Sequence, residues 1–156
     1  MKQELDKLLC EKYPKMMVNR NAPMTETCMC WGFDCGDGWF NILDQLMGNI
    51  QNHIDWNNKN FEKGYAQYKQ VPQVTLDQVK EKFGTLRFYY TGGDDEISGM
   101  VRMAESMSGV TCEECSAPAK THGPGWIRTI CKPCEEARDL ARQKANEEYE
   151  FKKLHE

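Results

Sequence analysis

No stretch of this 156-residue sequence approaches the roughly 18 to 20 consecutive apolar residues that a bilayer-spanning helix requires. The first seven residues, Met-Lys-Gln-Glu-Leu-Asp-Lys, carry acidic side chains and lack the apolar centre of an export signal. Hydrophobic residues make up 40% of the chain and charged residues 28%, which predicts a soluble, folded protein. We therefore expect a cytoplasmic protein with no membrane partner, in which paired cysteines bind metal rather than form disulfides.

An excess of positive charge is also absent. The net charge is −4: residues 1–70 carry 8 basic and 9 acidic side chains, residues 71–111 carry 4 and 6, and residues 112–156 carry 8 and 9. Nucleic-acid-binding proteins usually show a basic face, because neutralisation of phosphates dominates their affinity. This even balance disfavours nucleic acid as the partner, although folding can still gather basic residues into a local patch.

Known catalytic motifs are missing as well. Zinc deaminases carry His-x-Glu ahead of Pro-Cys-x-x-Cys, and none of the three histidines of this chain lies in that pattern. Nucleases of the HNH type need a histidine-rich core, which three scattered histidines do not provide. The segment Thr91-Gly-Gly-Asp94 lacks the Gly-Lys-Ser/Thr ending of a phosphate-binding loop. We therefore assign no catalytic residue.

One lesser enzymatic alternative stays open. Cys35 lies just before a predicted helix, whose N-terminus would lower the pKa of the thiol. With His53 as a base, or with a second metal ion, it would suit a hydrolase or nuclease. No motif around either residue supports that arrangement.

Two Cys-x-x-Cys pairs are the most specific feature of the chain. Cys112 and Cys115 form the first pair, Cys131 and Cys134 form the second, and fifteen residues separate the pairs. This spacing is typical of a four-thiolate zinc site, in which two turns aim their sulfurs at one point. Four thiolates leave no open position on the metal, so we predict one structural zinc ion. A histidine ligand such as His122 would be redundant.

A second group of cysteines is harder to interpret. Cys28, Cys30 and Cys35 lie within eight residues, and Cys10 or His53 would have to complete a metal site. The spacing does not match a recurrent zinc pattern, and free cysteine is among the residues most often buried. We expect buried thiols without metal, and a second metal site remains the alternative.

The periodicity of the N-terminal half predicts two helices. The first spans residues 2–12, and the second runs from residue 38 to about residue 56, with Asp37 as its cap. The second helix has a wide apolar stripe and is the expected core helix. Residues 14–36 are expected to be irregular, and residues 57–73 to form a loop or a broken helix.

The sequence from residue 74 onward predicts a hairpin, two helices and the metal module. Residues 74–90 form the hairpin, in which Val79, Glu81 and Phe83 alternate before the turn and Leu86, Phe88 and Tyr90 alternate after it. A helix follows Asp94 and ends near Gly109, and the last helix begins at Pro133 and ends near Leu154.

These elements predict an α+β fold, with helices packed on a small antiparallel hairpin or sheet. They also predict two parts. Residues 1–110 form the helix-and-hairpin core domain. Residues 111–156 form a zinc-ribbon-like module that holds the four metal-ligating cysteines and the C-terminal helix, and we call it the four-cysteine module.

Four side chains are candidates for partner binding. Strand alternation places Arg87 and Tyr89 together on the face opposite Leu86 and Phe88. Trp126 and Arg128 lie between the two cysteine pairs. If the module bound nucleic acid, Lys120 and Lys132 would join Arg128 around the metal, and Trp126 would stack on a base.

Three sequence blocks, taken in order, resemble a largely uncharacterised group of small zinc-knuckle proteins of tailed bacteriophages and prophages. The blocks are residues 28–39, residues 78–89, and the segment of the two cysteine pairs with its Gly-Trp-Ile-Arg-Thr insert at residues 125–129. The resemblance covers about residues 14–135. In one departure, Ser116 stands where zinc knuckles often have glycine.

The resemblance implies an accessory protein in the cytoplasm of a bacterial host. Together with the charge balance and the missing catalytic motifs, it favours a zinc-stabilised protein that binds a host protein, such as a defence or transcription component, and inhibits or redirects it. A nucleic-acid-binding zinc ribbon is the first alternative.

Overall fold

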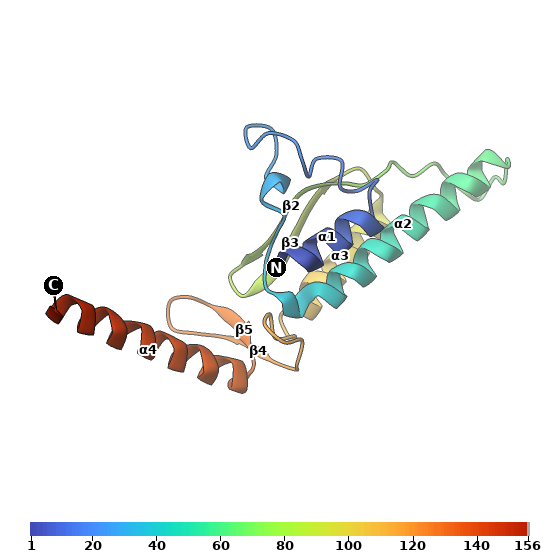
Figure 1. Ribbon diagram of the computed structural model, residues 1–156. Coiled ribbons are helices and arrows are strands. Elements are labelled where there is room, and N and C mark those ends of the chain that lie inside the picture. The colour runs from blue at the N-terminus through green and yellow to red at the C-terminus, as the bar shows by residue number, and fades with distance from the viewer. Residues whose placement is uncertain (156) are drawn as a thin grey trace.

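The computed structural model describes residues 1–155 of the chain, with side chains to residue 153 (Figure 1). The fold is α+β, as predicted. The helices are α1 (Gln3–Lys12), α2 (Phe40–Glu62), α3 (Asp95–Ser108) and α4 (Lys132–His155), with short 3-10 turns η1 (Met29–Trp31) and η2 (Asp37–Trp39). The strands are β1 (Phe33–Asp34), β2 (Thr75–Lys82), β3 (Thr85–Thr91), β4 (Lys120–His122) and β5 (Arg128–Ile130).

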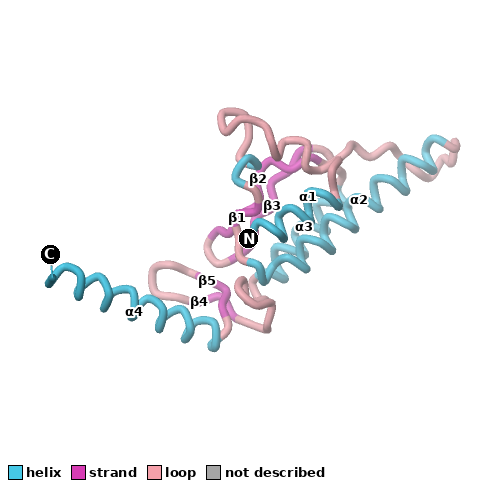
Figure 2. The backbone as a smooth tube through the Cα atoms, viewed as in Figure 1, coloured by secondary structure: helices cyan, strands magenta, loops and turns pink. Residues whose placement is uncertain are grey.

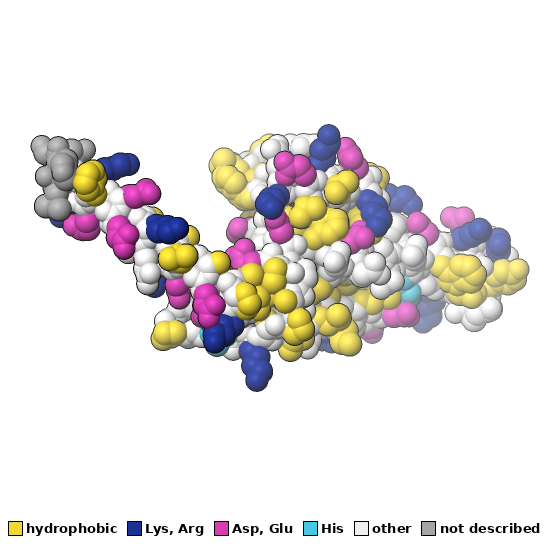
Figure 3. All heavy atoms as spheres, turned by 60° about the horizontal axis from the view of Figure 1, so that its bottom comes forward, with side chains coloured by type: hydrophobic (Ala, Val, Ile, Leu, Met, Phe, Trp, Pro, Cys, Tyr) yellow, Lys and Arg dark blue, Asp and Glu magenta, His cyan; other side chains and the backbone are white. Residues whose placement is uncertain are grey.

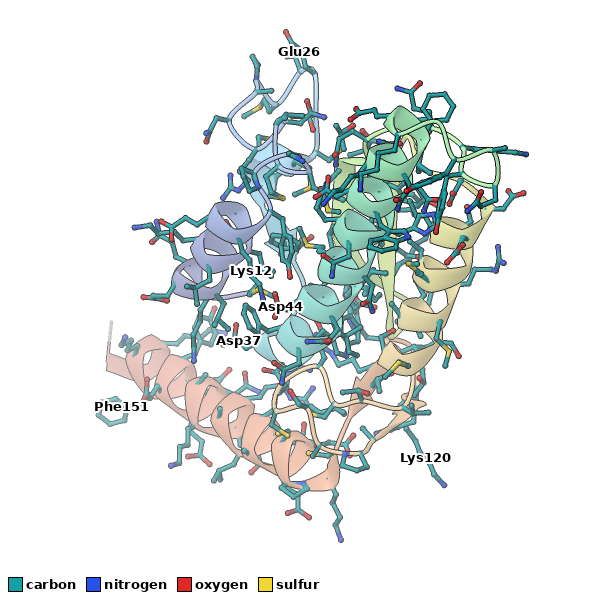
Figure 4. All side chains as sticks on the ribbon, turned by 90° about the vertical axis from the view of Figure 1, so that its right-hand side faces the viewer. Lys12, Glu26, Asp37, Asp44, Lys120 and Phe151 are labelled. Carbon is teal, nitrogen blue, oxygen red and sulfur yellow. The ribbon has the colours of Figure 1, made fainter. Side chains whose placement is uncertain are left out.

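A three-stranded mixed sheet and three helices enclose the core. Strand β1 pairs parallel to β2, and β2 pairs antiparallel to β3. The apolar stripe of α2 is buried from Leu43 to Ile54, and it meets Leu76, Val79 and Leu86 of the sheet in one apolar cluster. Helix α1 joins this body through the Lys12 ammonium, which lies 2.7 Å from an Asp44 carboxylate oxygen on α2 (Figure 4).

Helix α3 protects the open edge of the sheet. The backbone amides of Leu86 and Phe88 point away from β2, and they donate to the Ser108 hydroxyl at 2.8 Å and the Glu105 carboxylate at 3.0 Å. An edge strand with free amides would otherwise be open to pairing with another chain. The helix follows Asp94 as predicted, and the Asp94 carboxylate caps it by accepting from the Ile97 amide at 3.0 Å.

The predicted cap of α2 is wrong. The helix begins at Phe40 after the turn η2, and Asp37 accepts no hydrogen bond from its first turn. The Asp37 carboxylate instead accepts from the Lys2 amide at 2.7 Å and pairs with the Lys2 ammonium at 3.2 Å. The Asp37 side chain therefore binds the start of α1 instead of capping α2, as the pattern had predicted.

The end of α2 lies beyond the predicted residue 56, at Glu62. Its last turns are polar, and a tertiary contact supports them. Asn58 donates to the Val71 carbonyl at 3.0 Å and accepts from the Val71 amide at 2.7 Å. The Asn58 side chain thus satisfies both backbone groups of Val71, as a neighbouring strand would. The sequence pattern alone does not reveal this contact.

The hairpin of residues 74–90 is confirmed, apart from the position of Phe83. Phe83 was expected on strand β2, but it lies in the turn with φ 53° and its ring is exposed. Strand β1 was not predicted, because two residues are too few to show a period, and it lies in the loop between α1 and α2 (Figure 2).

The C-terminal part extends away from this core. Strands β4 and β5 form a separate two-stranded sheet, and α4 projects from it so that the far end of α4 lies away from the N-terminus (Figure 1). The large apolar residues of α4, Leu140, Tyr149 and Phe151, are exposed. No helix among the described residues is long and apolar enough to cross a membrane.

Candidate metal centre

Two tight turns present the four cysteines. In the first, the Cys112 amide donates to the Ala117 carbonyl at 2.8 Å, and the Ser116 amide donates to the Cys112 carbonyl at 3.0 Å. The second pair lies where β5 enters α4, with Pro133 in the first turn of the helix as predicted. The hairpin β4–β5 connects the two turns and brings them to the same place.

Ser116 explains how the first turn does without the usual glycine. It has φ 67°, a left-handed conformation that favours glycine. Its hydroxyl donates to the Gly38 carbonyl at 2.6 Å, which ties the turn to the core. A glycine would adopt the backbone more easily, but it would lose this anchor.

The four sulfurs converge on one point. The Sγ atoms of the four cysteines (Cys112, Cys115, Cys131 and Cys134) all lie within 4.8 Å of one another, and those of Cys115 and Cys131 are 3.5 Å apart. Zinc–sulfur bonds of about 2.3 Å in a tetrahedron place sulfurs about 3.8 Å apart. The cluster therefore has the size and ligand chemistry to hold one zinc ion, which would be coordinatively closed.

The protonation of the cluster fits a cation site. Burial raises the pKa of Cys112, but backbone amides of Cys131, Cys115 and Glu114 outweigh it and lower the pKa to about 7. Hydrogen bonding to the Cys115 thiol raises the pKa of Cys134 well above its usual value. The crowded thiols therefore resist complete ionisation on their own, and a metal ion would supply the charge that stabilises four thiolates.

The first turn is docked onto the start of α2. The Gly38 amide donates to the Glu113 carbonyl at 2.7 Å, and the Gly36 amide donates to the Glu113 carboxylate at 2.9 Å. The buried indole of Trp39 donates to the Thr111 carbonyl at 2.8 Å. Burial raises the pKa of Glu113, whereas the Gly36 amide opposes that shift. These contacts hold the first cysteine turn, with the buried Cys112, against the helix–sheet core.

The hairpin β4–β5 is docked onto the turn of β2–β3. The Thr129 hydroxyl, which is fully buried, donates to the Gly84 carbonyl at 2.5 Å. The Thr121 hydroxyl lies 2.7 Å from the Thr129 hydroxyl and donates to the Gly109 carbonyl at 3.1 Å. The proposed boundary between residues 110 and 111 thus lies at a packed junction, and the division into two domains stays a prediction.

The predicted binding pair on β3 lies on the outer face of the sheet. Tyr89 is partly exposed, with the Lys80 ammonium 5.9 Å from its ring centre. Arg87 is opposite Lys80 across the strands, but its guanidinium donates to the Thr85 hydroxyl at 2.6 Å and to the Leu86 carbonyl at 2.7 Å. These two bonds hold Arg87 back against its own hairpin, so Tyr89 is the more accessible of the two.

The second predicted pair lies at the tip and stem of the β4–β5 hairpin. The Trp126 side chain is 71% exposed, and the Arg128 guanidinium lies 5.8 Å from its ring centre. Of the two lysines considered with them, Lys120 points away from the body of the protein (Figure 4). Lys132 is exposed at the start of α4, where its ammonium lies 3.7 Å from the Glu136 carboxylate.

The N-terminal cysteines do not form a second cluster. Within residues 1–153, the four C-terminal cysteines are the sole group of three or more ligand side chains close enough to share a metal ion. Burial raises the pKa of Cys35 to about 12, which is opposite to the predicted effect of a helix N-terminus. His53 lies 2.8 Å from the Asp94 carboxylate rather than beside a thiol. The arrangement that an enzyme of the Cys35–His53 type requires is therefore absent from the described residues.

Sequence reasoning missed the residues that fix the site to the core. Glu113, Ser116 and the glycines at positions 36 and 38 lie outside the ligand pattern, although Gly-Asp-Gly next to a cysteine was a visible signal of close packing. Comparison with known proteins adds no relative: no family model, curated protein or solved structure matches this chain.

Proposed function

We propose that this chain is a small zinc-stabilised binding protein, in which one structural zinc ion holds a ribbon-like hairpin that presents an aromatic surface to a protein partner. The ligand set supports a structural ion, since four thiolates leave no position for substrate or water. The lack of a plausible catalytic pair at Cys35, among the residues that the structure describes, supports binding over catalysis.

One observation carries the proposal. Phe83, Trp126 and Ile127 line a common cleft where the β2–β3 turn meets the β4–β5 hairpin, and they are 68%, 71% and 37% exposed. We call these three side chains the aromatic patch. Exposed large apolar side chains that gather at one place mark interaction surfaces, and tryptophan is among the residues most enriched at binding hot spots.

The aromatic side chains of the patch lie on tight turns of the backbone. Phe83 has φ 53°, which is unfavourable for an aromatic residue. Trp126 follows Gly125 at φ 93° in a loop where Gly123 has φ 136°. The unfavourable backbone conformation of Phe83 persists because the surrounding structure enforces it, and the Thr129 hydroxyl of β5 contributes by donating to the carbonyl of the neighbouring Gly84.

The charges of the C-terminal region also favour a protein partner. On the face of α4 that Figure 3 shows, basic and acidic side chains alternate. A long polyanion would meet repulsion along such a surface. The resemblance of three sequence blocks to phage proteins supports a host protein as the partner, with inhibition or redirection of that protein as the outcome, in the cytoplasm of a bacterial host.

The test is capture of partners from bacterial extract by the tagged, zinc-loaded protein, followed by mass spectrometry. We expect one host protein to be retained by the wild type and lost with Trp126→Ala or Phe83→Ser. Trp31→Ala is the matched control, because Trp31 is 68% exposed but lies in η1, remote from the patch in sequence. Equal loss with Trp31→Ala, or capture that nuclease treatment abolishes, would contradict the proposal.

A further inference from the structure

A second cleft adjoins the aromatic patch, between the β4–β5 hairpin and the first turns of α4. Its volume is about 530 Å³, and its lining includes Trp126, Arg128, Arg138 and Arg142 together with Glu135 and Asp139. We call it the arginine cleft. Trp126 belongs to both clefts, so a ligand that covers the aromatic patch reaches the arginines without a gap.

We infer that the arginine cleft binds an acidic segment of the protein partner, whose carboxylates pair with Arg138 and Arg142. This inference rests on the proposed function, because the same partner would place an apolar residue on the aromatic patch. It adds the chemistry of the segment, namely apolar and acidic residues next to each other.

The spacing of the arginines suits a carboxylate ligand. Arg138 and Arg142 are one turn apart on α4 and therefore lie on the same face of the helix, across the cleft from the hairpin that carries Arg128. The permanently charged basic side chains that line the cleft are all arginines, and none is a lysine. A guanidinium offers a rigid fork of donors that matches the two oxygens of a carboxylate.

The donors of these arginines are largely unused within the protein. Among residues 1–153, Arg138 makes no hydrogen bond or ion pair. Arg142 has one contact, a carboxylate oxygen of Asp139 at 3.6 Å, which is too long for a good hydrogen bond. Arg128 lies over the Trp126 ring instead of pairing with an acid in the cleft. An incoming carboxylate would therefore find donors that are available.

The acidic side chains of the cleft favour a peptide over a nucleic-acid strand. Glu135 and Asp139 reduce the charge of the three arginines to +1, which suits a few carboxylates better than a chain of phosphates. Beyond the cleft, α4 continues with Glu147, Glu148 and Glu150, which would repel a strand that followed the helix.

The test uses the zinc-loaded full-length protein labelled with ¹⁵N, and it follows the Nε–Hε signals of the arginines by NMR. The probes are a short synthetic peptide of Phe and Glu, the same peptide with Gln in place of Glu, and an oligothymidylate of equal charge. We expect the acidic peptide to shift the Arg138 and Arg142 signals in a saturable way that weakens with salt. We expect no such shift with the Gln peptide.

Matched variants distinguish specific binding in the arginine cleft from a general effect of the positive charge of α4. Arg138→Gln with Arg142→Gln should weaken binding of the acidic peptide on the order of tenfold, because two charge-assisted contacts are lost. Lys144→Gln with Lys152→Gln removes the same charge from the same helix, and it should change binding by less than about twofold. Equal effects of both pairs, no arginine shift, or tighter binding of oligothymidylate than of the acidic peptide would overturn the inference.

Capture from extract distinguishes the two proposals. If Trp126→Ala abolishes capture and the arginine double variant leaves it unchanged, the inference is wrong and the proposed function stands. If neither variant changes capture, both are wrong. Loss of capture with each variant supports both.

Discussion

The helix–sheet core and the four-cysteine module differ in what holds them together. The core buries a continuous apolar cluster contributed by α1, α2, α3 and the three-stranded sheet. In the four-cysteine module the buried apolar cluster consists of Cys112, Ile130 and Cys131, and two of these are candidate metal ligands. Burial of a large aliphatic side chain contributes about 1.5–3 kcal/mol, so Ile130 alone cannot hold this module.

With one zinc ion bound, as we propose, a small region can fold with almost no hydrophobic core. A structural zinc ion contributes on the order of 10 kcal/mol, which is comparable to several buried aliphatic side chains. The remaining order comes from docking onto the core, through the contacts of Glu113 with Gly36 and Gly38 and of Thr129 with Gly84.

Removal of the metal should have the largest effect. Cys112→Ser or Cys131→Ser, or chelation of the wild-type protein, should remove on the order of 10 kcal/mol from the four-cysteine module. We expect hydrogen exchange to show loss of protection in β4 and β5, while α2 and β2 stay protected. Cys10→Ser is the control and should retain all the zinc. Full protection of β4 and β5 in reduced, metal-free protein would contradict the comparison.

Substitution of Trp39 should weaken the core where it meets the metal site. Trp39 is fully buried and its indole donates to the Thr111 carbonyl, so Trp39→Ala should cost about 3–5 kcal/mol of unfolding free energy. Urea unfolding measures this cost, and a chelator competition should show weaker zinc retention. The exposed Trp56 supplies the control, since Trp56→Ala should change stability by about 0.5 kcal/mol or less. Unchanged zinc retention in Trp39→Ala would mean that the four-cysteine module does not depend on the core.

Substitution of Gly38 should separate the two regions without removing an apolar side chain. A Cβ at Gly38 would lie 2.2 Å from the Cys112 carbonyl oxygen, so Gly38→Ala must push the first cysteine turn away from the core. We expect a loss of about 1–3 kcal/mol and faster release of zinc to a chelator. At Gly99, within α3, the nearest atom is the end of the Arg102 side chain at 3.8 Å. Gly99→Ala should therefore stabilise the protein by about 0.5–1 kcal/mol.

The sequence predicts the elements that depend on local patterns. The stripe of α2, the hairpin of β2 and β3 apart from Phe83, and the start of α3 after Asp94 are each visible in a few neighbouring residues, and the structure confirms them. The spacing of the two Cys-x-x-Cys pairs is equally local, and the sulfurs do lie together. Such features are predictable because the residues that make them are close in the chain.

The misses share a dependence on distant residues. Asp37 was predicted to cap α2 because it directly precedes that helix. Its actual partner, Lys2, lies 35 residues away and is not visible in the local pattern. The end of α2 depends on hydrogen bonds between Asn58 and Val71, and the arginine cleft depends on how α4 lies against the hairpin. A partner separated by many residues leaves no period in the sequence, so these features need the fold.

The smallest effect that we predict lies within the core and leaves the metal untouched. Asp94 caps α3 and contacts His53, so Asp94→Ala should cost about 1 kcal/mol at neutral pH without loss of zinc. Burial raises the pKa of Asp94, but the His53 and Ile97 hydrogen bonds outweigh it and the pKa is lowered. A lowered carboxyl pKa adds stability above the ordinary value near 3.8, and that stability is lost as the pH falls through the folded-state pKa. Urea unfolding across that range should show the wild type and Asp94→Ala converging in acid, whereas the exposed Asp95→Ala should differ from the wild type by only a few tenths of a kcal/mol.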